Sequence, residues 1–90
     1  MDILNNKYLV SEDIIIREED AVLFNMRKNI IVECNEVGFE IIQFLNKGLI
    51  VSDVVTELDK LYDVDREETL EEVVNFISTS IEDGLLVKGN

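Results

Sequence analysis

Cys34 is the only cysteine of this 90-residue sequence, and it is the first residue to consider for chemistry. A lone cysteine cannot close an intramolecular disulfide or build a thiolate metal site. The sequence contains no histidine that could activate the thiol, and no cluster of lysine and arginine stands beside it. We therefore interpret Cys34 as a small, buried hydrophobic residue at the end of a strand.

Carboxylates are the abundant reactive groups of the sequence, with 20 acidic against 8 basic residues and a formal charge of −12. Pairs such as Asp63 and Asp65 have no histidine, glycine-rich phosphate loop or EF-hand spacing beside them. The sequence thus predicts no catalytic residue, no metal site and no cofactor, and we expect a protein that is not an enzyme. The negative charge also disfavours nucleic acid as a partner and favours a basic peptide or protein surface.

Length and composition predict a single folded domain over residues 1–90, because 47% of the residues are hydrophobic and there is no proline, repeat or linker. No window resembles a secretory signal or a membrane span. The single cysteine favours a reducing cytoplasm. A domain of this size has modest stability on its own, so a monomer and a homodimer both stay open.

The first part of the chain has the pattern of short strands. Three apolar or β-branched runs, Ile14–Ile16, Ala21–Phe24 and Ile30–Cys34, are separated by polar stretches of four to five residues. Such spacing predicts a three-stranded antiparallel meander over residues 14–34. Tyr8–Val10 is expected to add a short extension to it.

The second part has the 3.6-residue periodicity of helices, with recognisable ends. Asn35 is suited to cap a helix over residues 36–46, which Gly48 terminates. Ser52 is expected to cap a helix over residues 53–62. Asp65, followed three residues later by a glutamate, has the pattern of a capping box for a helix over residues 66–83.

The helix over residues 66–83 has one apolar stripe and one less polar shoulder beside it. The wheel places the core stripe on Leu70, Val74, Ile77 and Ile81, with Val73 to one side. The shoulder continues from Val73 to Ser80, Thr69 and Phe76. For Phe76, the sequence leaves a core role and a ligand-contacting role equally open.

These elements predict an α+β fold, in which a three-stranded antiparallel sheet is followed by three helices in a winged helix-turn-helix-like arrangement. The chain also resembles the PqqD-like proteins, the RiPP recognition elements that bind leader peptides. The resemblance covers residues 14–87. It rests on Asn35–Gly38, Ser52–Val54, Tyr62–Asp65, Val73–Ile77 and Gly84–Leu86.

This resemblance implies a peptide-recognition module that binds the leader of a ribosomally made precursor peptide and presents it to a modifying enzyme, often a radical-SAM protein. In the family, the leader is added as a strand to the third strand, opposite the third helix. A free strand edge suits this mode, because its unpaired backbone groups can bond an extended peptide. The implied peptide-binding residues are Ile30, Ile31, Val32, Glu33, Cys34, Thr69, Val73, Phe76, Ile77 and Ser80.

Two residues depart from the family pattern, and one other function stays open. Cys34 and Ser80 stand where leucine is usual, and the smaller Ser80 opens room beside Phe76. The alternative is a small acidic interaction domain that docks on a folded protein instead of an extended peptide. A winged-helix DNA binder is disfavoured, because the third helix carries six acids against Arg66 alone.

Overall fold

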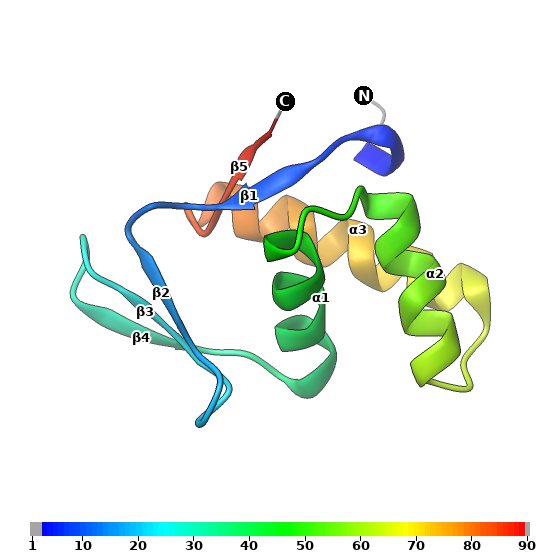
Figure 1. The fold of residues 1–90 in the computed structure, drawn as a ribbon, viewed down its shortest axis with the longest axis horizontal. Helices are drawn as coiled ribbons and strands as arrows, with labels where there is room; N and C mark the ends of the chain where they lie inside the picture. Colours follow the sequence, from blue (N-terminus) through cyan, green and yellow to red (C-terminus); the bar gives the residue numbers. More distant parts are fainter. Residues whose placement is uncertain (1–2, 90) are drawn as a thin grey trace.

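The computed structural model describes residues 3–89, and the elements in that range run from sheet to helix and back to sheet. Figure 1 shows three helices packed together, with the larger sheet projecting to one side of them and a short ribbon crossing above. The elements, in chain order, are η1 (Ile3–Asn5), β1 (Tyr8–Val10), β2 (Ile14–Arg17), β3 (Val22–Asn25), β4 (Ile30–Glu33), α1 (Glu36–Asn46), α2 (Val51–Leu61), α3 (Arg66–Glu82) and β5 (Leu86–Lys88).

The three β-branched runs form the antiparallel sheet that the sequence predicts, in the order β2-β3-β4. The register pairs Ile15 with Phe24 and Phe24 with Ile31. Each strand is connected to the next by a short turn. Asn29, directly before β4, has a φ of 56°, a left-handed conformation that asparagine tolerates better than most residues. The predicted α+β class, a three-stranded sheet followed by three helices, is confirmed.

The sequence predicts that Tyr8–Val10 extends that sheet. This prediction is wrong, because the segment forms a second sheet with β5. The strands are antiparallel, with Leu9 directly opposite Val87. The Ser11 N–H also donates to the Leu85 carbonyl at 2.9 Å, which fixes the corner between β1 and β2. Strands of three residues have too little alternation to be recognised, and their pairing joins segments about 80 residues apart, which explains why β5 was not predicted.

Most of the predicted helix ends are confirmed. The Asn35 side chain accepts the Gly38 N–H at 2.7 Å, and the Asp65 side chain accepts the Glu67 N–H at 3.5 Å. Gly48 and Gly84 follow α1 and α3 with φ values of 97° and 79°, the left-handed conformation common after a helix. The last helix ends at Glu82, within the usual uncertainty of one or two residues.

The predicted start of the second helix is wrong by two residues. α2 begins at Val51, its N-cap is Ile50 with no side-chain bond, and Ser52 lies within the first turn. Val51 is fully buried, and its N–H donates to the Asn6 carbonyl at 3.2 Å. Burial and this long-range bond therefore decide where α2 begins, and a serine at a suitable spacing does not.

The predicted core stripe of α3 is confirmed at Val73 and Ile77 and wrong at Leu70, Val74 and Ile81, because the buried face is rotated toward the shoulder. Ile81 is 41% exposed, and Leu70 and Val74 are only half-buried. α3 packs against α2, α1 and β5 through the side that holds two small polar residues. The Thr69 hydroxyl donates to the Asp65 carbonyl at 3.3 Å, which satisfies a polar group that would otherwise be costly to bury. The buried residues are Thr69, Val73, Ile77 and Ser80.

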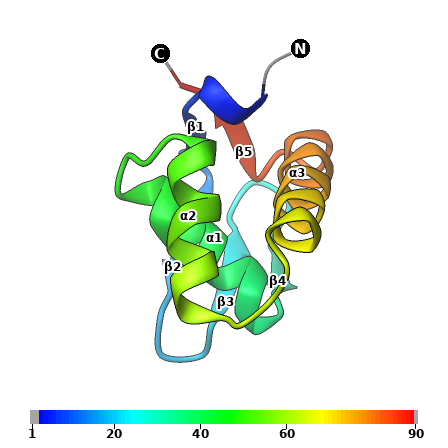
Figure 2. The same cartoon turned by 90° about the vertical axis from the view of Figure 1, so that its right-hand side faces the viewer.

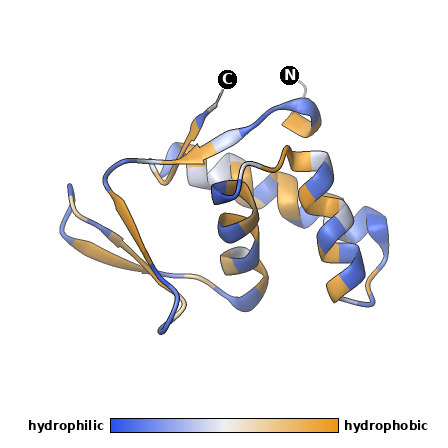
Figure 3. Ribbon diagram, viewed as in Figure 1, coloured by the Kyte–Doolittle hydropathy of each residue, from blue (hydrophilic) through white to orange (hydrophobic). Residues whose placement is uncertain are grey.

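The core lies between the helices and the inner face of the sheet. Its fully buried side chains include Leu23 from β3, Ile41 and Ile42 from α1, and Leu58 from α2. Figure 3 shows hydrophobic residues along much of the sheet, while hydrophilic and hydrophobic residues follow one another along α1 and α2. None of the helices in residues 3–89 is long and apolar enough to cross a membrane.

Candidate functional site

β4 is an edge strand of the sheet, as the sequence predicts. It pairs with β3 on one side only. In an antiparallel pair, alternate residues direct both their N–H and C=O groups away from the partner, so β4 offers unpaired backbone groups along its free edge. Ile30 and Ile31 are 47% and 60% exposed, which is unusual for two adjacent isoleucines.

The side chains of β4 alternate between the two faces of the sheet. Residues that pair across strands share a face, and Ile30 and Val32 pair with the buried Asn25 and Leu23. These two residues therefore lie on the helix side of the sheet. Ile31 and Glu33 lie on the outer face, where Ile31 continues the row that Ile15 and Phe24 begin. An extended peptide beside β4 would have side chains on both faces.

The helix α3 lies on the same side of the molecule as the free edge of β4 (Figure 2). A hollow of about 320 Å³ lies between the turn before β4 and the end of α3. Its lining includes Arg27 and Lys28, in the turn before β4, and Glu82 and Asp83, at the end of α3. The edge of β4 is thus open to an added strand on the side that α3 borders.

Phe76 fixes α3 against the start of α1, directly after β4. A Cβ added to Gly38 would lie 2.8 Å from Phe76 Cε1 and 3.0 Å from Asn35 Oδ1. The ring therefore packs against the backbone of Gly38, and a larger residue at this position would displace the ring. Asn35 caps the helix and Gly38 receives the ring, which gives a physical reason for asparagine and glycine at this spacing.

Four of the ten expected peptide-binding residues lie inside the protein. The packing of α3 against the other helices covers most of their surface, although Thr69 also lines a small cavity beside Tyr62. Their part in a peptide-binding groove stays a prediction, and Phe76 is the half-buried residue of the set on α3. The four are Thr69 (6% exposed), Val73 (0%), Ile77 (0%) and Ser80 (3%).

Cys34 is half-buried at the end of β4, consistent with a hydrophobic role. Burial raises the pKa of its thiol, so the thiol is protonated near neutral pH and is a poor nucleophile or metal ligand. No group of three or more cysteine, aspartate and glutamate residues in residues 3–89 is arranged to hold a metal ion.

The other end of α3 is acidic and borders a small apolar cavity. Glu68, Glu71 and Glu72 line a hollow on the outer surface of the helix. Glu72 also borders a cavity of about 60 Å³, which Val37 and Tyr62 line with other residues of α2 and α3. The free edge of β4 therefore has a neighbouring helix with a strongly negative N-terminal half.

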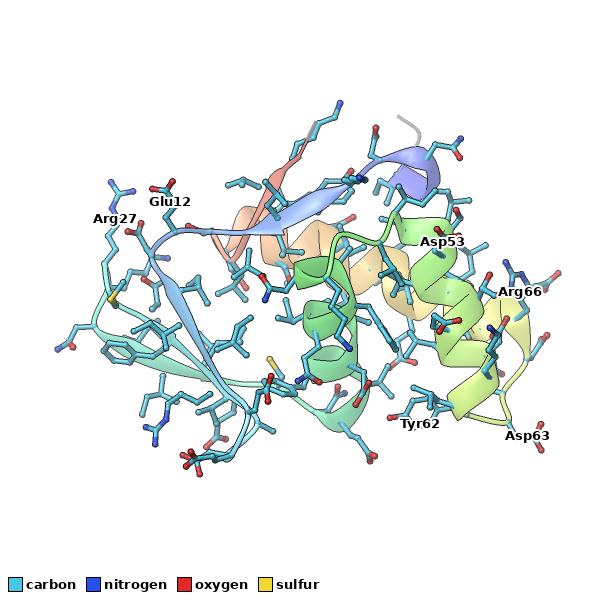
Figure 4. The ribbon with its side chains drawn as sticks, in the orientation of Figure 1. Glu12, Arg27, Asp53, Tyr62, Asp63 and Arg66 are labelled. Atoms are coloured by element: carbon cyan, nitrogen blue, oxygen red, sulfur yellow. The ribbon has the colours of Figure 1, made fainter. Side chains whose placement is uncertain are left out.

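Tyr62 connects the end of α2 to the start of α1 in this region (Figure 4). Burial, followed by the negative charges of Glu36 and Glu40, raises the pKa of its phenol. The phenol is therefore neutral near neutral pH and adds no charge beside these two acids.

Comparisons with known proteins agree with this architecture. The sequence matches the family described as coenzyme PQQ synthesis protein D (PqqD) over residues 20–86, a span that includes β4 and α3. No curated protein matches the chain.

Two solved structures are similar over nearly their whole length. One, described as lasso peptide synthetase B1 complexed with the leader peptide, has a TM-score of 0.81 and 22% identity, covering 90% of this chain and 98% of the other. The second, TbiB1 in complex with the TbiA(β) leader peptide, has a TM-score of 0.80 and 21% identity, with coverages of 87% and 93%. At these identities the likeness establishes a shared fold.

Proposed function

This chain belongs to the PqqD family, and on that premise we propose that it is a non-catalytic module that binds the leader of a ribosomally made precursor peptide. The observation that carries the proposal is the free edge of β4, with Ile30 and Ile31 exposed beside α3. Both solved structures described above were obtained with leader peptides, and their fold is the fold of this chain.

The proposed mode of binding is strand addition along β4. The backbone of residues 30–34 supplies hydrogen bonds that do not depend on the peptide sequence. Ile30 and Val32 contact peptide side chains that point toward the helices. Ile31 contacts a side chain on the outer face. The half-buried Phe76 is the residue of α3 proposed to contact the peptide, and the buried residues of α3 hold the helix in place.

The negative charge of the protein assists capture of a basic leader. The acidic half of α3 attracts lysine or arginine side chains during the approach of the peptide. Exposed charges act mainly on the association rate and are screened by salt. The affinity itself comes from main-chain bonds and apolar contacts.

The module is proposed to present its peptide to a modifying enzyme. The family resemblance suggests a radical-SAM maturase, whereas the description of the solved relative as a lasso peptide synthetase component favours an enzyme of lasso peptide synthesis. We place the protein in the reducing cytoplasm on the basis of its single cysteine. A second copy that paired through β4 would compete with the peptide, so the peptide-binding form is proposed to be the monomer.

A docking domain for a folded protein is the second candidate function. The row of Ile15, Phe24 and Ile31 on the outer face of the sheet favours it, since Ile15 and Ile31 are exposed and no element of the described chain covers them. This candidate predicts contacts on the outer face and an unoccupied β4 edge.

The experiment is a titration of the isotope-labelled protein with the synthetic precursor peptide that is encoded nearest to its gene. We expect saturable amide shifts over residues 30–34 and at Phe76, with smaller changes at β2. A folded protein that shows no shifts at peptide concentrations of about 0.5 mM would contradict the proposal. Shifts confined to Ile15 and Phe24 would support the second candidate.

A further inference from the structure

Two hollows near the β3–β4 turn share part of their lining, and together they are called the depression here. The first is the hollow of about 320 Å³ that Arg27 and Lys28 share with the end of α3. The second, about 350 Å³, is lined by β1 and by the corner that leads into β2. Both hollows are lined by Ser11, Asp13 and Val87. The lining of the depression thus includes the turn before β4 at one end and the β1–β5 ribbon at the other.

The floor of the depression is held by hydrogen bonds between its segments. The Met26 N–H donates to the Asp13 carbonyl at 2.8 Å, which ties the β3–β4 turn to the corner before β2. Ser11 is bonded to the chain segment after α3, as described above. The Asn25 side chain accepts the Lys28 N–H at 3.1 Å and shapes the turn itself. These bonds tie together the segments that line the depression.

An exposed apolar pair lies at the far end of the depression. Leu9 and Val87 are directly opposite each other in the β1–β5 ladder, so their side chains are neighbours on one face. They are 49% and 48% exposed, and both line the second hollow. Met26, in the β3–β4 turn, is exposed to the same extent. Exposed apolar residues thus lie in the β3–β4 turn as well as on the ribbon.

The charged residues that line the depression do not select for a ligand of one sign. Arg27 and Lys28 face a lining that also includes Asp13, Glu82 and Asp83, so both signs are present. Figure 4 shows Arg27 and Glu12 extending from this same corner of the molecule. A second copy of the chain is disfavoured as an occupant, because each copy carries a net charge of −12.

We propose that the bound peptide extends beyond β4 into this depression and packs one large apolar side chain against Leu9 and Val87. This inference rests on the proposed function, since β4 must hold the neighbouring part of the same peptide. The peptide would therefore be recognised at two places: an extended segment on β4, and a single apolar anchor at the β1–β5 ribbon. The anchor would bind a leader whose apolar residue lies outside the strand-forming segment.

The test compares a Leu9→Thr/Val87→Thr variant with a Leu61→Thr control. Threonine retains the strand preference of β1 and β5 while removing apolar surface. Leu61 is 58% exposed at the end of α2 and lines none of the hollows described above. The probes are the full-length synthetic precursor peptide and two versions shortened from either end. We expect the double variant to bind the full-length peptide about fivefold more weakly, and the control to bind it unchanged.

The shortened peptides make the result specific to the anchor. The shortened peptide that lacks the anchor residue is expected to bind the unaltered protein about fivefold more weakly than the full-length peptide does. The same shortened peptide is expected to bind the double variant and the unaltered protein with equal affinity. In the unaltered protein, the full-length peptide is expected to shift the amides of Ser11 and Val87, which is a readout independent of any variant. Equal affinities of the full-length peptide for the double variant and the unaltered protein, with peptide still bound at β4, would overturn this inference alone. Absence of binding to the unaltered protein would overturn the proposed function as well.

Discussion

The sheet has two edge strands, β2 and β4, which are equal in length but differ in what covers them. On β2, Ile14 is buried on the helix side, and Arg17 at its end forms a 3.0 Å ion pair with Asp20. On β4, the equivalent edge exposes Ile30 and Ile31. Both strands have unpaired backbone groups, so the backbone alone does not distinguish them. The difference lies in the helix-side face, which the chain itself covers at β2 and leaves open at β4.

The helices next to the two edges differ as well. A hollow of about 260 Å³ beside β2 is lined by Glu18 and by polar residues at the end of α1, including Gln43 and Lys47. β4 has α3 as its neighbour, with Phe76 packed at the start of α1. Charged side chains on an edge discourage strand addition, whereas an open apolar edge permits it. The comparison teaches that the two edges differ in the apolar surface they expose on the helix side, where Ile14 is buried and Ile30 is exposed.

The most direct test of this comparison is to introduce a charged residue on each edge strand. Ile30→Glu places a carboxylate on the helix-side face of β4, where the peptide would have to bury it unpaired. We expect the affinity for the precursor peptide to fall about tenfold or more, as measured by calorimetry.

Ile15→Glu on β2 is the matched control for this change. Ile15 is 45% exposed against 47% for Ile30, and both variants change the net charge equally. We expect Ile15→Glu to bind the peptide within about twofold of the unaltered protein, since exposed substitutions have small effects. Equal losses in the two variants would show that overall charge, and not the β4 edge, determines binding.

The second prediction concerns the contact that positions α3 beside β4. Alanine normally stabilises a helix relative to glycine by about 1 kcal/mol. At Gly38, however, the added Cβ would lie 2.8 Å from the Phe76 ring. We expect Gly38→Ala to lower the free energy of unfolding by about 1 to 3 kcal/mol, as measured by urea denaturation. Adding Phe76→Leu should recover part of this loss, and a stabilised Gly38→Ala variant would mean that the ring has room to move.

The third prediction separates the helix start that follows β4 from the start of α2. Asn35→Ala removes the bond to the Gly38 N–H and is expected to lower the free energy of unfolding by about 1 kcal/mol. Ser52→Ala removes no capping bond, because the N-cap of α2 is Ile50, and should change stability by less than about 0.5 kcal/mol. Urea denaturation of both variants checks this, and a larger loss at Ser52 would mean that its hydroxyl does cap the helix.

The elements that local pattern determines could be predicted from the sequence. The runs of β2, β3 and β4 and the caps Asn35 and Asp65 depend on neighbours within a few residues. The start of α2 and the pairing of β5 with β1 depend on contacts with distant residues. Those contacts leave little trace in a local pattern, which is why Ser52 was taken for a cap and β5 was not predicted.

Of the elements expected to form the candidate site, the position of β4 was easier to predict than the buried face of α3. β-strand alternation and the order of strands made β4 an expected edge, which the structure confirms. On α3, the wheel was centred on the large residue Leu70, whereas the helix buries Thr69 and Ser80 toward its neighbours. Which face of a helix is buried depends on the partner it meets, and small residues permit the closest approach. The packing of the Phe76 ring against Gly38 could not be predicted either, because this contact joins two distant segments of the chain.

The smallest expected effect concerns the charge next to the two edges. Glu72→Lys reverses a charge on the acidic half of α3, and Glu19→Lys makes the same change in the exposed turn between β2 and β3. Both variants have the same net charge, so the overall field of the protein changes equally. We expect Glu72→Lys to slow association of a lysine- or arginine-bearing peptide about twofold to threefold more than Glu19→Lys does at low salt.

Stopped-flow measurements at low salt and at about 0.5 M salt separate this local attraction from other effects of the substitution. Because the screening length falls to a few ångströms at high salt, the difference between the two variants should disappear there, while the dissociation rates stay similar. A difference that persists at high salt would mean that Glu72 contacts the bound peptide directly. The acidic half of α3 would then belong to the binding surface beside β4, and the contrast between the two edges would include a specific side-chain contact as well as an open strand.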